Sequence, residues 1–225
     1  MKRRTLLATV VAVLTIPAAA VAATGPAVTV RVEGLKRTLL APTVIHPRSG
    51  SITKFGAPNG KCPADSAQGA LDVATRHQWG GSWSATYQEY EILSVLGETH
   101  SFSSKYYWEI FADNVASSAG ACELKLHSGE QLLFAAVPDS GTTFPLALEA
   151  PKSATVGHRF TVKVVYFKGA KAIALAGATV SVGGQRGKTN SHGTVALTAS
   201  HAGTFVVHAQ RAGYVRAAPV TLHVS

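Results

Sequence analysis

Hydrophobic and polar residues alternate near the start of the chain, a pattern typical of β-strands buried on one face. Val28, Val30 and Val32 alternate with polar side chains up to Gly34, and this period of two predicts a half-buried strand. The next run, TLLAPTVI, continues as an extended segment. Because proline cannot donate a hydrogen bond to a neighbouring strand, Pro42 restricts this segment to the edge of a sheet.

Three later runs also predict strands. The segment EYEILSVLGE places Tyr90 and Ile92 two residues apart and ends near Gly97. The segment YYWEIFAD is the next expected strand. The longer run CELKLHSGEQLLFAAV predicts a pair of strands bent at Ser128 and Gly129.

The period changes between residues 65 and 77, where one helix is expected. Apolar residues stand at i, i+3, i+4 and i+7, namely Ala67, Ala70, Leu71 and Ala74. Asp65 as N-cap and Gln68 as its capping-box partner would begin this helix. The following glycine-bearing segment, QWGGSWSATY, is expected to be a loop. One helix among about five strands predicts a small α+β sheet with the helix on one face.

The second half of the chain has no helical period. Six short runs rich in β-branched residues are separated by glycine turns: FPLALEAP, HRFTVKVVYF, GATVSVGG, GTVALTA, GTFVVHAQ and APVTLHVS. Regular short strands of this kind predict an antiparallel all-β sandwich.

Residues 1–23 have the features of a secretory signal peptide. Lys2, Arg3 and Arg4 precede an apolar run at residues 5–16, and small residues at 20–23 offer a cleavage site. Pro17 and the alanine-rich end favour cleavage over an uncleaved membrane anchor. Nothing later in the sequence is long and apolar enough to span a membrane. We therefore expect a secreted protein, extracellular or associated with the cell envelope.

Composition and charge divide the rest of the chain into two expected domains. All three tryptophans and both cysteines precede residue 140, and the segment VPDSGTTFP has the composition of a linker. Residues 24–143 contain nine Lys or Arg and eleven Asp or Glu, whereas residues 144–225 contain nine Lys or Arg and one acid. We expect domains at residues 24–138 and 146–225, joined by a linker at 139–145.

The first domain resembles a known family. The ordered segments VTVRVEG, SAQGALDVAT, EYEILSVLGE, YYW followed by Asn114, AGAC and SGEQLLF are similar to a domain of secreted and surface proteins in Gram-positive bacteria, related to the C-terminal domain of transcobalamin and intrinsic factor. The resemblance covers about residues 28–137 and implies a β-grasp-like sheet that holds one helix and is used for binding. The animal cobalamin carriers close over their ligand with a large helical domain, for which this chain has no room. No cofactor is therefore predicted.

The second domain resembles a different class of module. The segments GATVSV, KTNSHGTVAL and AGTFVVHAQRAGY are similar to bacterial immunoglobulin-like and carboxypeptidase-regulatory-type surface modules. Such modules are usually spacers or adhesive domains. The resemblance brings no catalytic residues with it.

The two cysteines are expected to form a disulfide. An even number of cysteines in an exported protein favours a disulfide, and Cys62 and Cys122 allow one intramolecular pairing. The bond would connect the start of the helix to the sheet. A free thiol or an intermolecular link is the alternative.

An aromatic cluster marks the expected ligand site. In an alternating strand, Tyr107 and Trp108 point to opposite faces, so one of them can enter the core while the other faces outward. Ordinary core packing accounts for part of this cluster. The alternative is a groove, lined by one of these rings, by the loop that carries two tryptophans, by Asn114 and by the close-approach position Gly120. The expected ligand-binding residues are Tyr107, Trp108, Asn114, Gly120, Trp79 and Trp83.

Two apparent motifs carry no function. GGQRGKT ends like a phosphate-binding loop, but Val182 stands where that loop needs its first glycine. His192, His201 and His208 have no acidic or cysteine partners nearby in the sequence, so no metal site is predicted. The acids form no obvious catalytic pair, and no nucleophile motif is present.

Two classes of function remain. The preferred hypothesis is a non-enzymatic binding or adhesion protein whose first domain recognises a small molecule, a glycan or a peptide. Its basic second domain would contact an anionic cell-wall polymer, and nucleic acid is not expected as a specific partner because no base-reading motif accompanies the charge. The alternative is an envelope-acting hydrolase, or an inhibitor of one, that uses the aromatic groove as its cleft.

Overall fold

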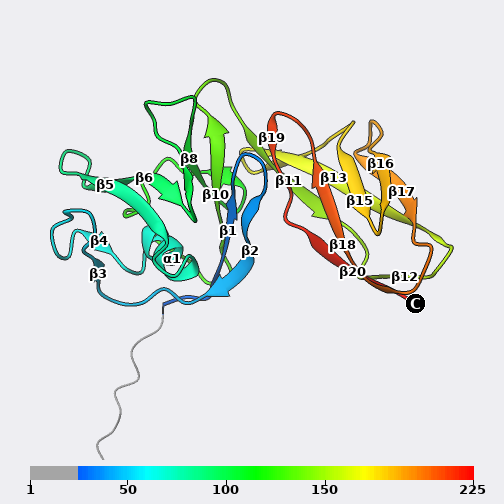
Figure 1. The fold of residues 1–225 in the computed structure, drawn as a ribbon, viewed down its shortest axis with the longest axis horizontal. Coiled ribbons are helices and arrows are strands. Elements are labelled where there is room, and N and C mark those ends of the chain that lie inside the picture. Colours follow the sequence, from blue (N-terminus) through cyan, green and yellow to red (C-terminus); the bar gives the residue numbers. More distant parts are fainter. Residues whose placement is uncertain (1–24) are drawn as a thin grey trace, which may run out of the picture.

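The computed structural model describes residues 25–225, whose regular secondary structure is almost entirely β-strand (Figure 1). Strands account for 51% of these described residues and helix for 4%. The α+β β-grasp prediction for the first domain is therefore wrong, because several sheets and one short helix stand where a single sheet with a covering helix was expected. The predicted signal peptide lies outside the described residues. Within residues 25–225, no helix has the length and apolar character needed to cross a membrane.

The main sheet of the first half has the strand order β2-β1-β10-β8-β9. Its members are β1 (Val28–Glu33), β2 (Thr38–Ile45), β8 (Tyr106–Ala112), β9 (Val115–Ala116) and β10 (Gln131–Pro138). β1 runs parallel to β10, and the other neighbours are antiparallel. The strand that contains Pro42 lies at the sheet edge, as predicted.

A second sheet, of order β5-β6-β7, explains much of the failed prediction. It consists of β5 (Trp79–Ser84), β6 (Glu89–Val95) and β7 (Glu98–Thr99), and a separate pair consists of β3 (Ser51–Ile52) and β4 (Cys62–Pro63). The segment expected to be a loop is β5, which pairs with β6. Gly81 suits this strand because a Cβ atom there would lie 2.3 Å from the Glu91 carbonyl oxygen. β6 is therefore held in its own sheet and does not join the main one.

The helix α1 (Ala67–Ala74) has the predicted position but a different N-cap. Ser66 is the N-cap, and its hydroxyl accepts a hydrogen bond from the Gly69 amide, so the prediction of Asp65 as the cap was wrong. The helix is short because Arg76 and His77 adopt left-handed backbone angles just beyond its end.

Loop 117–124 lies against the start of this helix. The amides of Ala67 and Gln68, which lack partners inside a helix, donate to the carbonyls of Leu124 and Ala121. The predicted strand at residues 122–126 is not formed, because these backbone groups bind the helix end and not a neighbouring strand.

The second half contains two five-stranded sheets with a hydrophobic core between them. One sheet consists of β11 (Phe144–Glu149), β13 (Arg159–Lys168), β14 (Lys171–Ala174), β17 (Thr194–Thr198) and β19 (Tyr214–Val215). The other consists of β12 (Ser153–Ala154), β15 (Thr179–Val182), β16 (Gln185–Lys188), β18 (Gly203–Gln210) and β20 (Val220–Val224). This arrangement is compatible with the predicted all-β sandwich.

The two halves are in direct contact. Glu33, which is 1% exposed, forms ion pairs with Arg31 of its own strand at 2.8 Å and with Arg216 of the second half at 2.9 Å. Beside this network, Val215 packs against an apolar cluster from β8 and β10 that includes Phe111 and Leu133. A buried charge network and apolar contacts therefore hold the halves together.

Candidate functional site

A groove of about 650 Å³ lies between the two sheets of the first half. One wall is formed by β6 at residues 89–92 and the other by β8 at residues 107–110. Loop 117–123 forms a further side, while Tyr87 and Phe102 stand at the rim, 75% and 61% exposed. The groove is large enough for a small organic ligand or a short segment of chain.

The rings of Phe102 and Tyr107 form a stacked pair in this groove. Their centroids are 4.8 Å apart with an interplanar angle of 28°. Tyr107 is partly buried, whereas Trp108 is only 4% exposed and belongs to the main core. The sequence left open which of the two rings enters the main core; Trp108 does, whereas Tyr107 packs at the edge of the apolar cluster that includes Phe111 and Val215.

A short hydrogen bond joins two side chains in the groove. The Tyr107 hydroxyl donates to Glu109 Oε2 at 2.5 Å. Burial raises the pKa of Tyr107 to about 12, and the hydrogen bond and negative charge of Glu109 contribute to the shift. Tyr107 therefore stays a neutral donor at physiological pH, and its hydroxyl holds the Glu109 side chain beside the aromatic pair.

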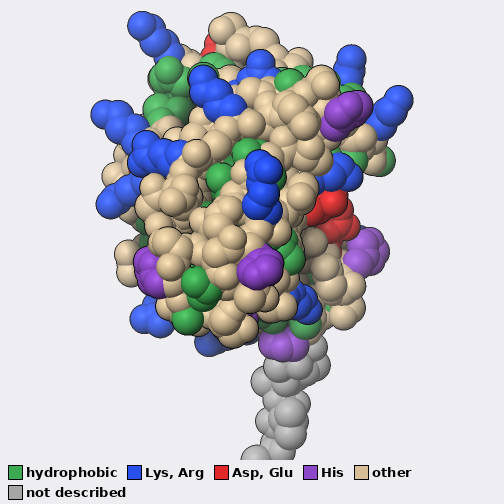
Figure 2. All heavy atoms as spheres, turned by 90° about the vertical axis from the view of Figure 1, so that its right-hand side faces the viewer, with side chains coloured by type: hydrophobic (Ala, Val, Ile, Leu, Met, Phe, Trp, Pro, Cys, Tyr) green, Lys and Arg blue, Asp and Glu red, His purple; other side chains and the backbone are tan. Residues whose placement is uncertain are grey.

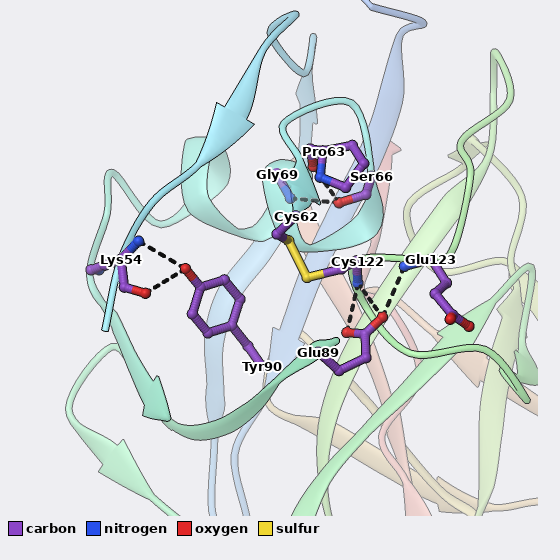
Figure 3. The surroundings of a disulfide bond; sticks show 9 residues. All are labelled: Lys54, Cys62, Pro63, Ser66, Gly69, Glu89, Tyr90, Cys122 and Glu123. Carbon is purple, nitrogen blue, oxygen red and sulfur yellow. Dashed lines mark hydrogen bonds between the residues drawn. A yellow bond between two sulfur atoms is a disulfide. The ribbon is translucent and has the colours of Figure 1, made fainter. Parts of the chain in front are cut away.

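The charged side chains that line the groove, as far as the described residues show, are all acidic. They are Glu89, Glu91, Glu109 and Glu123. Glu89 is the one tied to the backbone: its oxygens accept hydrogen bonds from the Cys122 and Glu123 amides at 2.9–3.0 Å (Figure 3). Burial raises the pKa of Glu89, while these backbone hydrogen bonds oppose the shift. The electrostatic potential of the groove favours a cation.

The predicted disulfide between Cys62 and Cys122 is present, with the Cα atoms 4.9 Å apart (Figure 3). It joins β4, just before the helix, to the loop that lines the groove. Gly120 lies in this loop, and a Cβ atom at its position would lie 2.3 Å from the Glu89 carboxyl carbon. The absence of a side chain at Gly120 therefore makes room for Glu89, which holds the loop in place.

The groove contains half of the ligand-binding residues predicted from the sequence. Tyr107, Trp108 and Gly120 line it, whereas Trp79, Trp83 and Asn114 do not. Trp79 and Trp83 pack edge-on against Tyr90, each with a centroid distance of 5.1 Å.

Trp79 is a core residue, 4% exposed, and its indole nitrogen donates to Asp72. Asn114 forms a left-handed turn between β8 and β9 and lines a different, smaller cavity.

The sequence analysis did not predict that Phe102 at the rim of the groove, or the glutamates that line it, belong to the site. Phe102 comes before the predicted strand, in a serine-rich segment with no periodic pattern. Glu109 could have been found, because it stands two residues after Tyr107 and therefore shares its face of the strand. Glu89 begins β6 and Glu123 lies in the loop that Glu89 binds, and the sequence contains no local signal that brings these two segments together.

The basic side chains of the second half lie on its surface. Figure 2 shows the end of the molecule formed by this half, with Lys and Arg side chains projecting in many directions and few acidic ones in view. Eight of its nine basic residues are exposed, and the exception is Arg216 at the contact between the halves. Residues 25–225 contain no group of three His, Cys, Asp or Glu side chains that could hold a metal ion.

A comparison of the chain with protein-family models and with curated proteins finds no match in either.

Proposed function

We propose that this chain is an exported, non-enzymatic binding protein of the bacterial cell envelope, and that the groove between β6 and β8 binds a cationic ligand. The observation that carries the proposal is the composition of the groove. A stacked aromatic pair and four carboxylates surround it, and Lys and Arg are absent from its described lining.

Aromatic faces and carboxylates together favour a positively charged group. A cation within about 6 Å of an aromatic ring gains roughly 0.5–2 kcal/mol, depending on how far it is desolvated. Glu109 provides a charge beside the ring of Tyr107, and Glu91 provides another from the opposite wall. A lysine or arginine side chain, or a small amine, has the matching chemistry.

The disulfide and the charge of the second half support the proposed location. Structural disulfides persist in oxidising compartments outside the cytoplasm. The exposed basic residues would be attracted to phosphate- or carboxylate-rich wall polymers. The binding groove and the envelope contact would then lie in different halves of one protein.

A hydrolase is the second candidate, because Glu89 is a carboxyl with a raised pKa inside a groove. Its two oxygens, however, already accept hydrogen bonds from backbone amides. A general acid needs a free oxygen that can reach the substrate. The geometry of Glu89 fits the support of a loop better than proton transfer.

The test is a titration of the full chain with Nα-acetyl-lysine methylamide, in which binding is monitored by NMR chemical shifts. The matched uncharged probe is Nα-acetyl-norleucine methylamide. We expect the lysine probe to shift signals of residues 107–110 and the norleucine probe to bind at least tenfold more weakly. Equal binding of the two probes, or no binding of either, would overturn the proposal.

Two double variants locate the binding site. Glu91→Gln/Glu109→Gln removes two groove charges and should weaken binding of the lysine probe at least tenfold. The control Glu149→Gln/Asp65→Asn removes two exposed charges outside the groove and should leave the affinity within twofold. A loss of hydrolytic activity towards wall material in the Glu89→Gln variant would favour the hydrolase.

A further inference from the structure

One edge of β8 is free where it borders the groove. β8 pairs with β10 along its whole length, from Tyr106 to Ala112. On its other side it pairs with β9 at Phe111 and Ala112 alone among the described residues. Between Tyr106 and Ile110, the edge of β8 that borders the groove is therefore not paired with another strand.

The register shows which backbone groups point to this edge. In an antiparallel ladder, successive residues direct their N–H and C=O groups alternately towards one neighbour and the other. The Ile110 carbonyl accepts from the Ser117 amide and the Tyr106 carbonyl accepts from the Ser101 amide, both on the side away from β10. Trp108 lies midway between these residues, so its N–H and C=O point the same way.

The backbone of Trp108 is the available pairing position. Within residues 25–225, no hydrogen-bond partner of its amide or carbonyl is found on this side. The neighbouring Ile110 and Tyr106 have partners through their carbonyls, which leaves a short unpaired stretch between two occupied positions. Free strand edges of this kind accept an extended segment as an additional strand.

The charge of the groove specifies the occupant. Side chains of an added strand would alternate between its two faces, one of them towards Tyr107 and Glu109. Lysine or arginine at every second position would meet the carboxylates of Glu91, Glu109 or Glu123, and its alkyl stem could lie along the ring of Phe102. An acidic segment would meet repulsion from the same side chains.

We propose that the ligand is an extended peptide segment with lysine or arginine at alternate positions, which binds by adding a strand to the free edge of β8 at Trp108. This inference rests on the proposed function of the groove and specifies its ligand class. Tyr106 and Ile110, the two occupied positions, are about 13 Å apart along the strand at the usual rise per residue. The paired stretch is therefore only a few residues long.

The test uses the capped hexapeptide acetyl-Lys-Thr-Lys-Thr-Lys-Thr-amide and the full chain with its disulfide intact. Two N-methylated versions carry the methyl groups on the lysine amides or on the threonine amides. Because alternate amides of an added strand face β8, one version should bind at least tenfold more weakly and the other within about threefold of the parent. Hydrogen exchange of the Trp108 amide should slow at least tenfold in the complex.

The outcomes separate the two proposals. If both N-methylated peptides bind like the parent and the Trp108 amide exchanges unchanged, strand addition is wrong while cation binding stands. If acetyl-Glu-Thr-Glu-Thr-Glu-Thr-amide binds as well as the lysine peptide, the predicted ligand charge is wrong. If neither the lysine peptide nor Nα-acetyl-lysine methylamide binds, both proposals fail.

Discussion

Tyr107 and Glu109 form a coupled pair whose two members have different tasks in the proposed site. The phenol stays protonated because burial and the adjacent carboxylate both disfavour its anion. The Glu109 carboxylate accepts the hydrogen bond of the Tyr107 hydroxyl at 2.5 Å, which holds its orientation in the groove. The pair therefore presents a fixed negative charge beside an aromatic face.

We predict that Glu109→Gln lowers the pKa of Tyr107 from about 12 towards its usual value near 10. The decrease should be partial, because burial is the larger cause and the substitution does not remove it. Titration of ring-labelled tyrosine by NMR measures the change directly. The control Glu91→Gln changes a carboxylate on the opposite wall and should leave the pKa of Tyr107 nearly unchanged.

Because the pKa of Tyr107 is raised in the folded chain, its contribution to stability is lost as the pH rises. Below pH 10 both the folded and unfolded chains hold the Tyr107 proton, so its contribution to stability is complete. As the pH rises from about 10 to about 12, the unfolded chain loses the proton first, and this contribution disappears. An unchanged pKa in Glu109→Gln would show that Glu109 does not influence the phenol.

At the scale of elements, loop 117–124 is held from three directions. The disulfide links it to β4, and the Glu89 carboxylate accepts hydrogen bonds from its amides. Its carbonyls accept hydrogen bonds from the first amides of α1. The loop in turn lines the groove. The stability of the first half and the shape of the site therefore depend on the same contacts.

The double variant Cys62→Ser/Cys122→Ser tests this dependence. The cysteines are 60 residues apart, and opening a loop of that length should lower the free energy of unfolding by about 2–4 kcal/mol. Urea denaturation measures the loss, and affinity for the lysine hexapeptide should fall in parallel. Reduction of the native protein with dithiothreitol is the control and should have the same effect. Unchanged stability and affinity in both preparations would contradict this account.

The sequence predicted the strands better than their association into sheets. The alternation of Val28, Val30 and Val32 identified β1, and the helical period identified residues 67–74. A local pattern cannot show which strands pair, however, since pairing depends on contacts between distant segments. The segment around Gly80 and Gly81 was therefore mistaken for a loop, although it pairs with β6.

The site was predictable where it follows strand alternation and not where it depends on tertiary contacts. The period of two places Tyr107 and Trp108 on opposite faces of the strand, but it does not show which ring enters the main core. Trp79 and Trp83 were expected in the groove as conspicuous aromatics, but they pack against Tyr90. Phe102 reaches the groove by stacking on Tyr107, a contact that leaves no sequence signal.

At the scale of the whole molecule, Glu33 connects the two halves. Its carboxylate pairs with Arg31 and Arg216 and accepts a hydrogen bond from the Thr38 hydroxyl. Removing one member of a buried network leaves the others charged and without compensation. The contact is therefore sensitive to the loss of this single carboxylate.

We predict that Glu33→Gln lowers the free energy of unfolding by about 3 kcal/mol, the size expected for breaking a buried ion pair. The matched control is Glu149→Gln, which breaks a 3.5 Å pair with Lys163 in which both side chains are well exposed. That change should cost less than about 1 kcal/mol. Equal effects of the two variants in urea denaturation would show that the network at Glu33 does not stabilise the protein.

We predict that the basic surface of the second half binds the protein to the cell wall in a salt-dependent way. Its exposed charges should hold the full chain on anionic wall polymers by long-range attraction, which salt screens as the Debye length falls from about 10 Å at 0.1 M to about 3 Å at 1 M. The chain should sediment with cell-wall fragments at low salt and be released at high salt. Lys163→Gln/Lys168→Gln/Lys171→Gln should weaken this binding, whereas Lys36→Gln/Arg37→Gln/Lys61→Gln, which removes exposed charges of the first half, should not. Equal effects of the two triple variants, or binding that persists in 1 M salt, would contradict retention by the charge of the second half.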